Sequence, residues 1–163
     1  VGCGKTILAI ALMAVAAQSG VQAALLAPTE LLAQQHYRVL RGYLVRLGVR
    51  VELLAQGIKP AARAGLLQDV AQGRALVLVG THALLQESVQ FKSLGLAIVD
   101  EQHKFGVSQR AALAKKGEAP DVLVMSATPI PRTMALSIYG DLTCSTIEEL
   151  PAGRSAARVV ART

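Results

Sequence analysis

Residues 1–6, V-G-C-G-K-T, carry the residue types of a loop that binds nucleotide phosphates. The phosphate-binding pattern G-x-x-x-x-G-K-[ST] ends here in Gly4, Lys5 and Thr6, and its first glycine would lie before the start of this sequence. Gly2 and Gly4 let backbone N–H groups turn toward a phosphate, and a helix starting at Lys5 would direct its positive end at the same anion. Lys5 would pair with β- and γ-phosphate oxygens, and the Thr6 hydroxyl would bind Mg²⁺. A glycine turn before an ordinary buried helix explains these residues equally well.

Asp100 and Glu101 could supply the second half of the same site, because they follow the apolar run L-A-I-V of residues 96–99. An aspartate at a strand end beside a phosphate-binding loop coordinates Mg²⁺ directly or through water. The adjacent Glu101 can polarise an attacking water as a general base. A charged strand end at the surface is the structural alternative for any Asp-Glu pair. Both halves in one sequence of alternating helices and strands favour a site for a nucleoside triphosphate and Mg²⁺.

The segments that must position these residues alternate between helix-like and strand-like patterns. Helices are expected over residues 5–19, 29–47 and 60–72, and the first of them is apolar all round and expected to be buried. Strands are expected over residues 21–27, 49–54, 75–79, 96–100 and 122–126. This alternation predicts an α/β fold with a mainly parallel central sheet flanked by helices. In such sheets ligands bind where strand ends meet helix N-termini.

Composition limits the class of protein. The 163 residues suit one domain, with 52% apolar and only 3% aromatic residues, so the core must be built from Ala, Leu and Val. No apolar run is long enough to suggest a membrane span. The two cysteines, Cys3 and Cys144, form no C-x-x-C and suggest neither a disulfide framework nor zinc, which favours a reducing cytosol. The net charge of +6 favours a polyanionic partner weakly, because a solvated basic face gives the same balance.

Asp100-Glu101-Gln102-His103 resembles motif II, D-E-x-H, of the superfamily 2 helicases. The stretches A-P-T-E-L (27–31), G-T-H (80–82) and S-A-T (126–128) resemble motifs Ia, Ib and III of the same superfamily, in the same order. The extension P-I-P-R-T (129–133) is similar to RecG-type branched-DNA helicases and to transcription-repair coupling factors. Gln102, together with residues 80–91 and 149–154, resembles the RecG family more than the coupling factors, although Lys104 stands where RecG more usually has arginine.

The RecG resemblance implies the first RecA-like P-loop motor domain of an ATP-dependent helicase that acts on branched double-stranded DNA, at stalled forks and Holliday junctions. It implies a motor domain over residues 1–148, truncated so that its first strand, the P-loop strand, is missing. Residues 149–163 would be a linker toward an absent second motor domain. The isolated chain is expected to bind ATP weakly and hydrolyse it poorly. The full protein is expected to be a monomer in the bacterial cytosol, associated with the nucleoid and not with a membrane.

The same resemblance assigns roles to individual residues. The nucleotide-binding residues would be Gly2, Cys3, Gly4, Lys5 and Thr6, with Mg²⁺ held by Thr6 and Asp100. The catalytic residues would be Asp100, Glu101, Gln102 and His103. The residues that couple nucleotide state to DNA would be Ser126, Ala127 and Thr128. The DNA-binding residues would be Pro28, Thr29, Glu30, Gly80, Thr81, His82 and Arg132.

Several alternatives stay open from the sequence. Thr29 and Thr81 also read as plain helix N-caps, and His36 and His82 as solvated or helix-packing residues. Cys3 at a helix start could be an acidified thiol whose alkylation blocks ATP binding, or a residue at a tolerant position. At the level of the whole protein, the alternatives are the motor of a coupling factor and a non-catalytic nucleotide-gated interaction domain. Glu101 and residues 126–128 argue against the second, because a pure binder needs neither.

Overall fold

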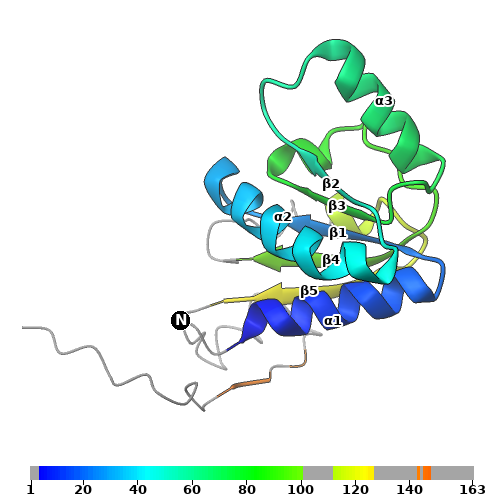
Figure 1. The fold of residues 1–163 in the computed structure, drawn as a ribbon. Helices are drawn as coiled ribbons and strands as arrows, with labels where there is room; N and C mark the ends of the chain where they lie inside the picture. The colour runs from blue at the N-terminus through cyan, green and yellow to red at the C-terminus, as the bar shows by residue number, and fades with distance from the viewer. Residues whose placement is uncertain (1–3, 101–111, 127–142, 144, 148–163) are drawn as a thin grey trace, which may run out of the picture.

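A five-stranded parallel sheet forms the centre of the computed structural model, which describes residues 4–100, 112–126, 143 and 145–147 (Figure 1). The strands are β1 (Gln22–Leu26), β2 (Val51–Leu54), β3 (Val77–Gly80), β4 (Leu94–Asp100) and β5 (Asp121–Met125). Their order across the sheet is β2-β3-β1-β4-β5, and every neighbouring pair is parallel. The predicted α/β fold with a parallel sheet is therefore confirmed.

Helices cover both faces of this sheet, as parallel strands require. α1 (Lys5–Gln18) and α2 (Glu30–Leu44) share one hydrophobic core with one face of the sheet, and α2 continues as the 3₁₀ helix η1 (Val45–Leu47). α3 (Pro60–Ala71) and the 3₁₀ helix η2 (His82–Leu85) pack on the opposite face. None of the helices in this part of the chain has both the length and the apolar character to cross a bilayer.

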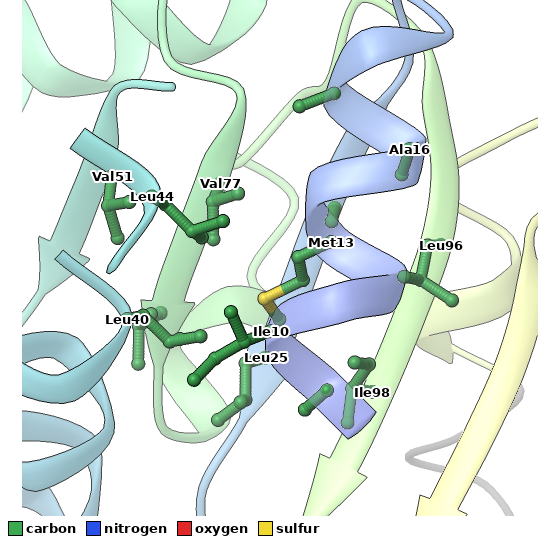
Figure 2. Close-up of a cluster of buried hydrophobic side chains, with 14 of the residues drawn as sticks. Ile10, Met13, Ala16, Leu25, Leu40, Leu44, Val51, Val77, Leu96 and Ile98 are labelled. Carbon is green, nitrogen blue, oxygen red and sulfur yellow. The ribbon is translucent and has the colours of Figure 1, made fainter. Parts of the chain in front are cut away.

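Successive residues of each strand feed the two cores alternately. Leu25, Val77 and Ile98 point to the α1–α2 side, where Met13 and Leu40 meet them (Figure 2). Their neighbours along the strands belong to the second core, against α3 and η2. The two cores consist almost wholly of Ala, Leu, Val and Ile, as the low aromatic content predicts.

The burial of α1 differs from the sequence expectation. Although its sequence is apolar all round, Ile7, Leu8 and Val15 are 58%, 44% and 60% exposed. Only its sheet-facing side, which includes Ala9 and Met13, is buried among the described residues. The cause is geometric, since a helix lying on one face of a sheet presents only part of its circumference to that sheet.

A buried glutamine, Gln22, connects three segments at the amino-terminal edge of the sheet, where the strands begin. Gln22 begins β1 and is 2% exposed. Its Nε2 donates to the carbonyls of Val70 and Ala75 at 2.9 and 2.8 Å, and its Oε1 accepts from the Ser93 N–H at 3.0 Å. One side chain thus ties the start of β1 to the α3–β3 connection and to the start of β4.

Candidate nucleotide-binding site

The start of α1 has the conformation that the glycine-rich opening predicts. Gly4 has φ +88°, a left-handed conformation that costs glycine no steric strain. An added Cβ there would meet no atom within 4 Å, so the conformation, and not crowding, calls for glycine. No described side chain caps the first turn of α1, and the Ile7 N–H donates to the Gly4 carbonyl at 2.9 Å. A helix N-terminus of this kind favours an anion.

Topology brings this helix start to the carboxyl-terminal edge of the sheet. α1 leads into β1 through a short turn and runs antiparallel to it, so Lys5 and Thr6, both half-buried, lie at the strand-end edge (Figure 1). Asp100 is the last residue of β4 and is 8% exposed. It pairs in register with Met125 of β5, so Ser126 follows at the same edge. The predicted site residues within the described part of the chain therefore gather on one edge.

Asp100 has a partner that the sequence did not reveal. His36, from the middle of α2, places Nε2 2.7 Å from Asp100 Oδ2. The two side chains are 13% and 11% exposed. The sequence suggested that His36 is a solvated or helix-packing residue, but in the structure it is a hydrogen-bond partner of Asp100. The signal that could have found it is its place on the sheet-facing side of α2, three residues after Ala33 and four before Leu40, both fully buried.

The oxygen donors at this edge fit a magnesium–nucleotide complex. A carboxylate and a hydroxyl are hard ligands, which Mg²⁺ prefers, and Mg²⁺ typically takes only one or two protein carboxylates beside substrate phosphates. Asp100 and Thr6 provide that donor set. No group of three His, Cys, Asp or Glu side chains suited to a metal occurs within residues 4–100 and 112–126. The arrangement suits a metal that arrives with phosphates better than a closed protein cage.

The described residues expected on the DNA side lie at two strand ends, Pro28 to Glu30 after β1 and Gly80 to His82 at the end of β3. Thr29 caps α2, with its hydroxyl oxygen accepting from the Leu32 N–H at 3.3 Å, so its N-cap reading is confirmed. Thr81 does not cap η2 with its side chain; it is 3% exposed and its hydroxyl donates to Glu30 Oε1 at 3.1 Å. This hydrogen bond joins the first turn of α2 to the end of β3. Pro28 is half-buried and His82 is exposed.

Gly80 has a packing role that its motif did not suggest. A Cβ at Gly80 would lie 3.1 Å from the Leu54 carbonyl oxygen and 3.1 Å from the Leu84 side chain. Such contacts are tighter than most observed ones, and the backbone oxygen belongs to the neighbouring strand β2. The absence of a side chain at Gly80 thus permits the close approach of β2 and η2.

The arginines between residues 38 and 50, in α2, in η1 and just before β2, are only partly a solvated face. Arg38, Arg41 and Arg46 are exposed and line a shallow surface hollow of about 440 Å³ that does not include Asp100, and Arg41 lies 5.9 Å from the centroid of the Tyr37 ring. Arg50 differs, because it contacts Glu52 and Asp69 at 2.8 and 2.6 Å. Those carboxylates raise the pKa of Arg50 further.

The remaining predicted site residues lie outside the described part of the chain. They are Gly2, Cys3, Glu101, Gln102, His103, Ala127, Thr128 and Arg132. The expected linker, residues 149–163, lies outside it as well.

Comparisons with known proteins agree with the motifs. The family model described as DEAD/DEAH box helicase matches residues 1–136. The chain is 53% identical over 154 residues to the ATP-dependent DNA helicase RecG of Synechocystis sp., covering 94% of this chain and 18% of that protein. It is 53% identical over 156 residues to RecG of Aquifex aeolicus, covering 94% and 20%. RecG of Escherichia coli is 48% identical over 165 residues, covering 99% and 24%. The chain thus spans about a fifth to a quarter of the length of these relatives.

A solved structure is also similar. RecG bound to a three-way DNA junction matches with a TM-score of 0.81 and 44% identity, over 95% of this chain and 21% of that one. The helicase MrfA bound to DNA matches with a TM-score of 0.62 at 19% identity, over 77% and 18%, which speaks for the fold alone.

Proposed function

Since this chain belongs to the DEAD/DEAH box helicase family, we propose that it is the ATP-hydrolysing motor domain of a RecG-type helicase that acts on branched DNA. The single observation that carries the proposal is the 53% identity to RecG proteins over 94% of the chain. A RecG relative is named as bound to a three-way junction, which supports branched DNA as the partner. The coupling factor and the nucleotide-gated interaction domain have no comparable support.

ATP would bind at the carboxyl-terminal edge of the sheet. The backbone amides of Gly2, Cys3 and Gly4 and the first turn of α1 would surround the phosphates. Lys5 would pair with their β and γ oxygens, and Thr6 and Asp100 would hold Mg²⁺. The metal, when bound, neutralises charge that builds on the phosphate oxygens. The uncapped start of α1 and the buried carboxylate at the end of β4 support this assignment.

Hydrolysis would transfer the γ-phosphoryl group to water. Glu101 would accept a proton from the attacking water as its oxygen bonds to the γ-phosphorus, while the bond to the β–γ bridging oxygen breaks. ADP and inorganic phosphate are the products. Gln102 and His103, with Ser126, Ala127 and Thr128, would relay the change in nucleotide state by hydrogen bonds. Residue 126 follows the strand that neighbours Asp100, which supports a relay over this short distance.

The DNA backbone would lie across the loops after β1 and β3. Thr29 and Pro28 precede the N-terminus of α2, where backbone N–H groups suit phosphates. His82 is exposed at the start of η2. Glu30 and Thr81 would act by holding these two loops together through their hydrogen bond, and Gly80 by allowing close packing. Arg132 would contact either DNA or the second motor domain.

We also propose the larger organisation. Residues 1–148 would be the motor domain and residues 149–163 the connector to a second one. The complete protein would act as a monomer in the bacterial cytosol at the nucleoid.

The test uses the complete protein that contains this chain, with Lys5→Ala and Glu101→Gln variants. ATP hydrolysis is measured with no DNA, with linear duplex and with a three-way junction, and unwinding is measured on the junction. We expect the junction to stimulate hydrolysis most. Glu101→Gln should bind ATP normally yet lower turnover by roughly 10²–10⁴-fold, the usual contribution of a general base.

Matched controls are Lys59→Ala and Glu118→Gln, because both side chains are exposed and neither lies at the proposed site. Both controls should keep normal turnover. Junction-independent hydrolysis would contradict the branched-DNA substrate. Normal turnover of Glu101→Gln would show that another group activates the water.

A further inference from the structure

The contact between His36 and Asp100 links a helix to the proposed metal-binding carboxylate. His36 lies in α2 and Asp100 ends β4, 64 positions later in the chain, with 2.7 Å between Nε2 and Oδ2. A carboxylate oxygen only accepts hydrogen bonds, so Nε2 is the donor in this contact. Hydrogen bonds to ionised acceptors are short and strong compared with neutral ones. The contact therefore fixes one of the two oxygens of Asp100.

The helix that carries His36 is held against the sheet by contacts of its own. Ala33 and Leu40, on the same side of α2 as His36, are both fully buried against the sheet. The Thr29 cap and the Glu30–Thr81 hydrogen bond secure the first turn of the same helix. These contacts fix the backbone of α2 against the sheet, so the Cα of His36 keeps its place relative to the end of β4.

A buried carboxylate that must bind a metal benefits from such a partner. Metal-ligating carboxylates are usually oriented by further hydrogen bonds, and loss of an orienting partner typically weakens metal binding or activity by roughly 10–100-fold. His36 occupies Oδ2, and no described residue donates a hydrogen bond to Oδ1. Oδ1 is then the oxygen left for Mg²⁺ or a water bound to it.

We propose that His36 is a positioning residue that orients the Asp100 carboxylate for the magnesium–nucleotide complex. The inference rests on the proposed function, because it assumes that ATP and Mg²⁺ bind at this edge. His36 touches neither nucleotide nor metal in this scheme. Its effect is specific to metal-dependent binding, whereas a purely structural role would alter thermal stability alone.

The test measures equilibrium binding of ADP to the complete protein as Mg²⁺ is raised, without any catalytic readout. His36→Leu keeps the apolar bulk and removes the donor, and His36→Gln offers an amide donor in its place. We expect His36→Leu to raise the Mg²⁺ concentration at half-saturation by roughly 10–100-fold and to leave metal-free ADP binding unchanged. His36→Gln should recover most of that loss. Gln35→Ala, at an exposed position of the same helix, should match the wild type.

Each result separates the inference from the function on which it rests. If the wild-type protein shows no Mg²⁺-dependent binding of ADP, the proposed function itself fails. If the wild type shows it and both His36 variants titrate like Gln35→Ala, the positioning role is wrong although the function stands. A melting temperature that falls in His36→Leu with an unchanged Mg²⁺ titration would likewise overturn the proposal. Should His36→Leu not fold, His36→Ala takes its place as the variant without a donor, with the same rise in the Mg²⁺ requirement expected, and a titration equal to that of Gln35→Ala would overturn the role.

Discussion

Replacing Gln22 by methionine should destabilise this domain without touching its proposed site. Methionine has a similar length and fills the same space, but it has no N–H donor and no good acceptor. The Ala75 carbonyl, with Ala75 itself 1% exposed, and the Ser93 N–H would lose the hydrogen bonds that Gln22 now makes. The Val70 carbonyl would keep the Gly73 N–H, which donates to it at 3.0 Å. The change therefore leaves one buried carbonyl unsatisfied, that of Ala75, and removes the acceptor of one N–H in the exposed residue Ser93.

The expected magnitude follows from that count. The unsatisfied buried carbonyl of Ala75 costs about 1–3 kcal/mol, and losing the hydrogen bond to the Ser93 N–H, which water can reach, costs about 0.5–1.5 kcal/mol. Burying the apolar end of methionine returns about 1 kcal/mol or slightly more. The net loss in the free energy of unfolding should be about 0.5–3.5 kcal/mol, against a total of about 5–15 kcal/mol that domains have.

Urea denaturation of the chain, followed by far-ultraviolet circular dichroism, measures this loss. With a slope of about 2 kcal/mol per molar urea, the midpoint should fall by about 0.3–1.8 M at unchanged slope. Hydrogen exchange of the Ser93 amide should accelerate beyond the average for β4, because its acceptor is removed. Gln18→Met at an exposed position of α1 is the matched control. A midpoint for Gln22→Met equal to that of Gln18→Met would refute the reasoning.

Further predictions concern the stability of two glycine variants and the pH dependence of stability in an Asp69 variant. Gly80→Ala should lower the free energy of unfolding by about 1–3 kcal/mol, because its Cβ would press on the Leu54 carbonyl. Gly65 lies inside α3 with open space around it, so Gly65→Ala should raise the free energy of unfolding by up to about 1 kcal/mol. Equal urea midpoints for Gly80→Ala and Gly65→Ala would contradict both expectations. A hydrogen bond from Arg74 is the main cause that lowers the pKa of Asp69 below its ordinary value of 3.8; burial opposes it, and a hydrogen bond from Arg50 adds to the lowering. The ionised Asp69 therefore contributes to stability above pH 3.8, and this contribution is lost as the pH falls through the lowered pKa. Asp69→Asn should accordingly flatten the acid side of a plot of melting temperature against pH. If the plots of the variant and the wild type run parallel, this prediction is wrong.

Sequence patterns predicted the helices and strands well, because apolar runs and helix caps are formed by residues that are close together in the chain. Apolar runs marked the strands, and Thr29 with its hydrogen bond to the Leu32 N–H starts α2 where the sequence placed it. The ends of elements were less predictable. The helix expected to reach residue 47 becomes 3₁₀ at Val45, and the strand expected from residue 75 begins at Val77. There the Ala75 carbonyl accepts from Gln22, a partner 53 positions away, and no local pattern encodes it.

The order of the strands could not be read from the chain for the same reason. β1 lies between β3 and β4, which follow it by dozens of residues. The partnerships at the site are equally distant, since 64 positions separate His36 from Asp100 and 51 separate Glu30 from Thr81. A lone histidine in a helix carries no local sign of a carboxylate brought to it by the sheet. The motif around Gly80 suggested DNA contact, whereas its crowding by Leu54 emerges only when the strands are paired.

Buried polar residues at the two edges of this sheet make different kinds of hydrogen bond. Those at the amino-terminal edge should therefore affect stability, and those at the carboxyl-terminal edge should affect ligand binding. At the amino-terminal edge, Gln22 uses both its amide nitrogen and its oxygen on the backbone of three segments, which leaves no group for a ligand. At the carboxyl-terminal edge, Asp100 Oδ2 accepts from His36, and under our proposal Oδ1 is the oxygen that binds Mg²⁺ or a water on it. Ligands of parallel α/β sheets bind at this second edge. It follows that Gln22→Met should lower the urea midpoint and leave the Mg²⁺ titration of ADP binding unchanged. His36→Leu should alter mainly that titration. His36→Gln should change neither measurement greatly. If Gln22→Met shifted the titration as far as His36→Leu does, the two edges would be coupled through the strands, and the separation argued from their hydrogen bonds would be wrong.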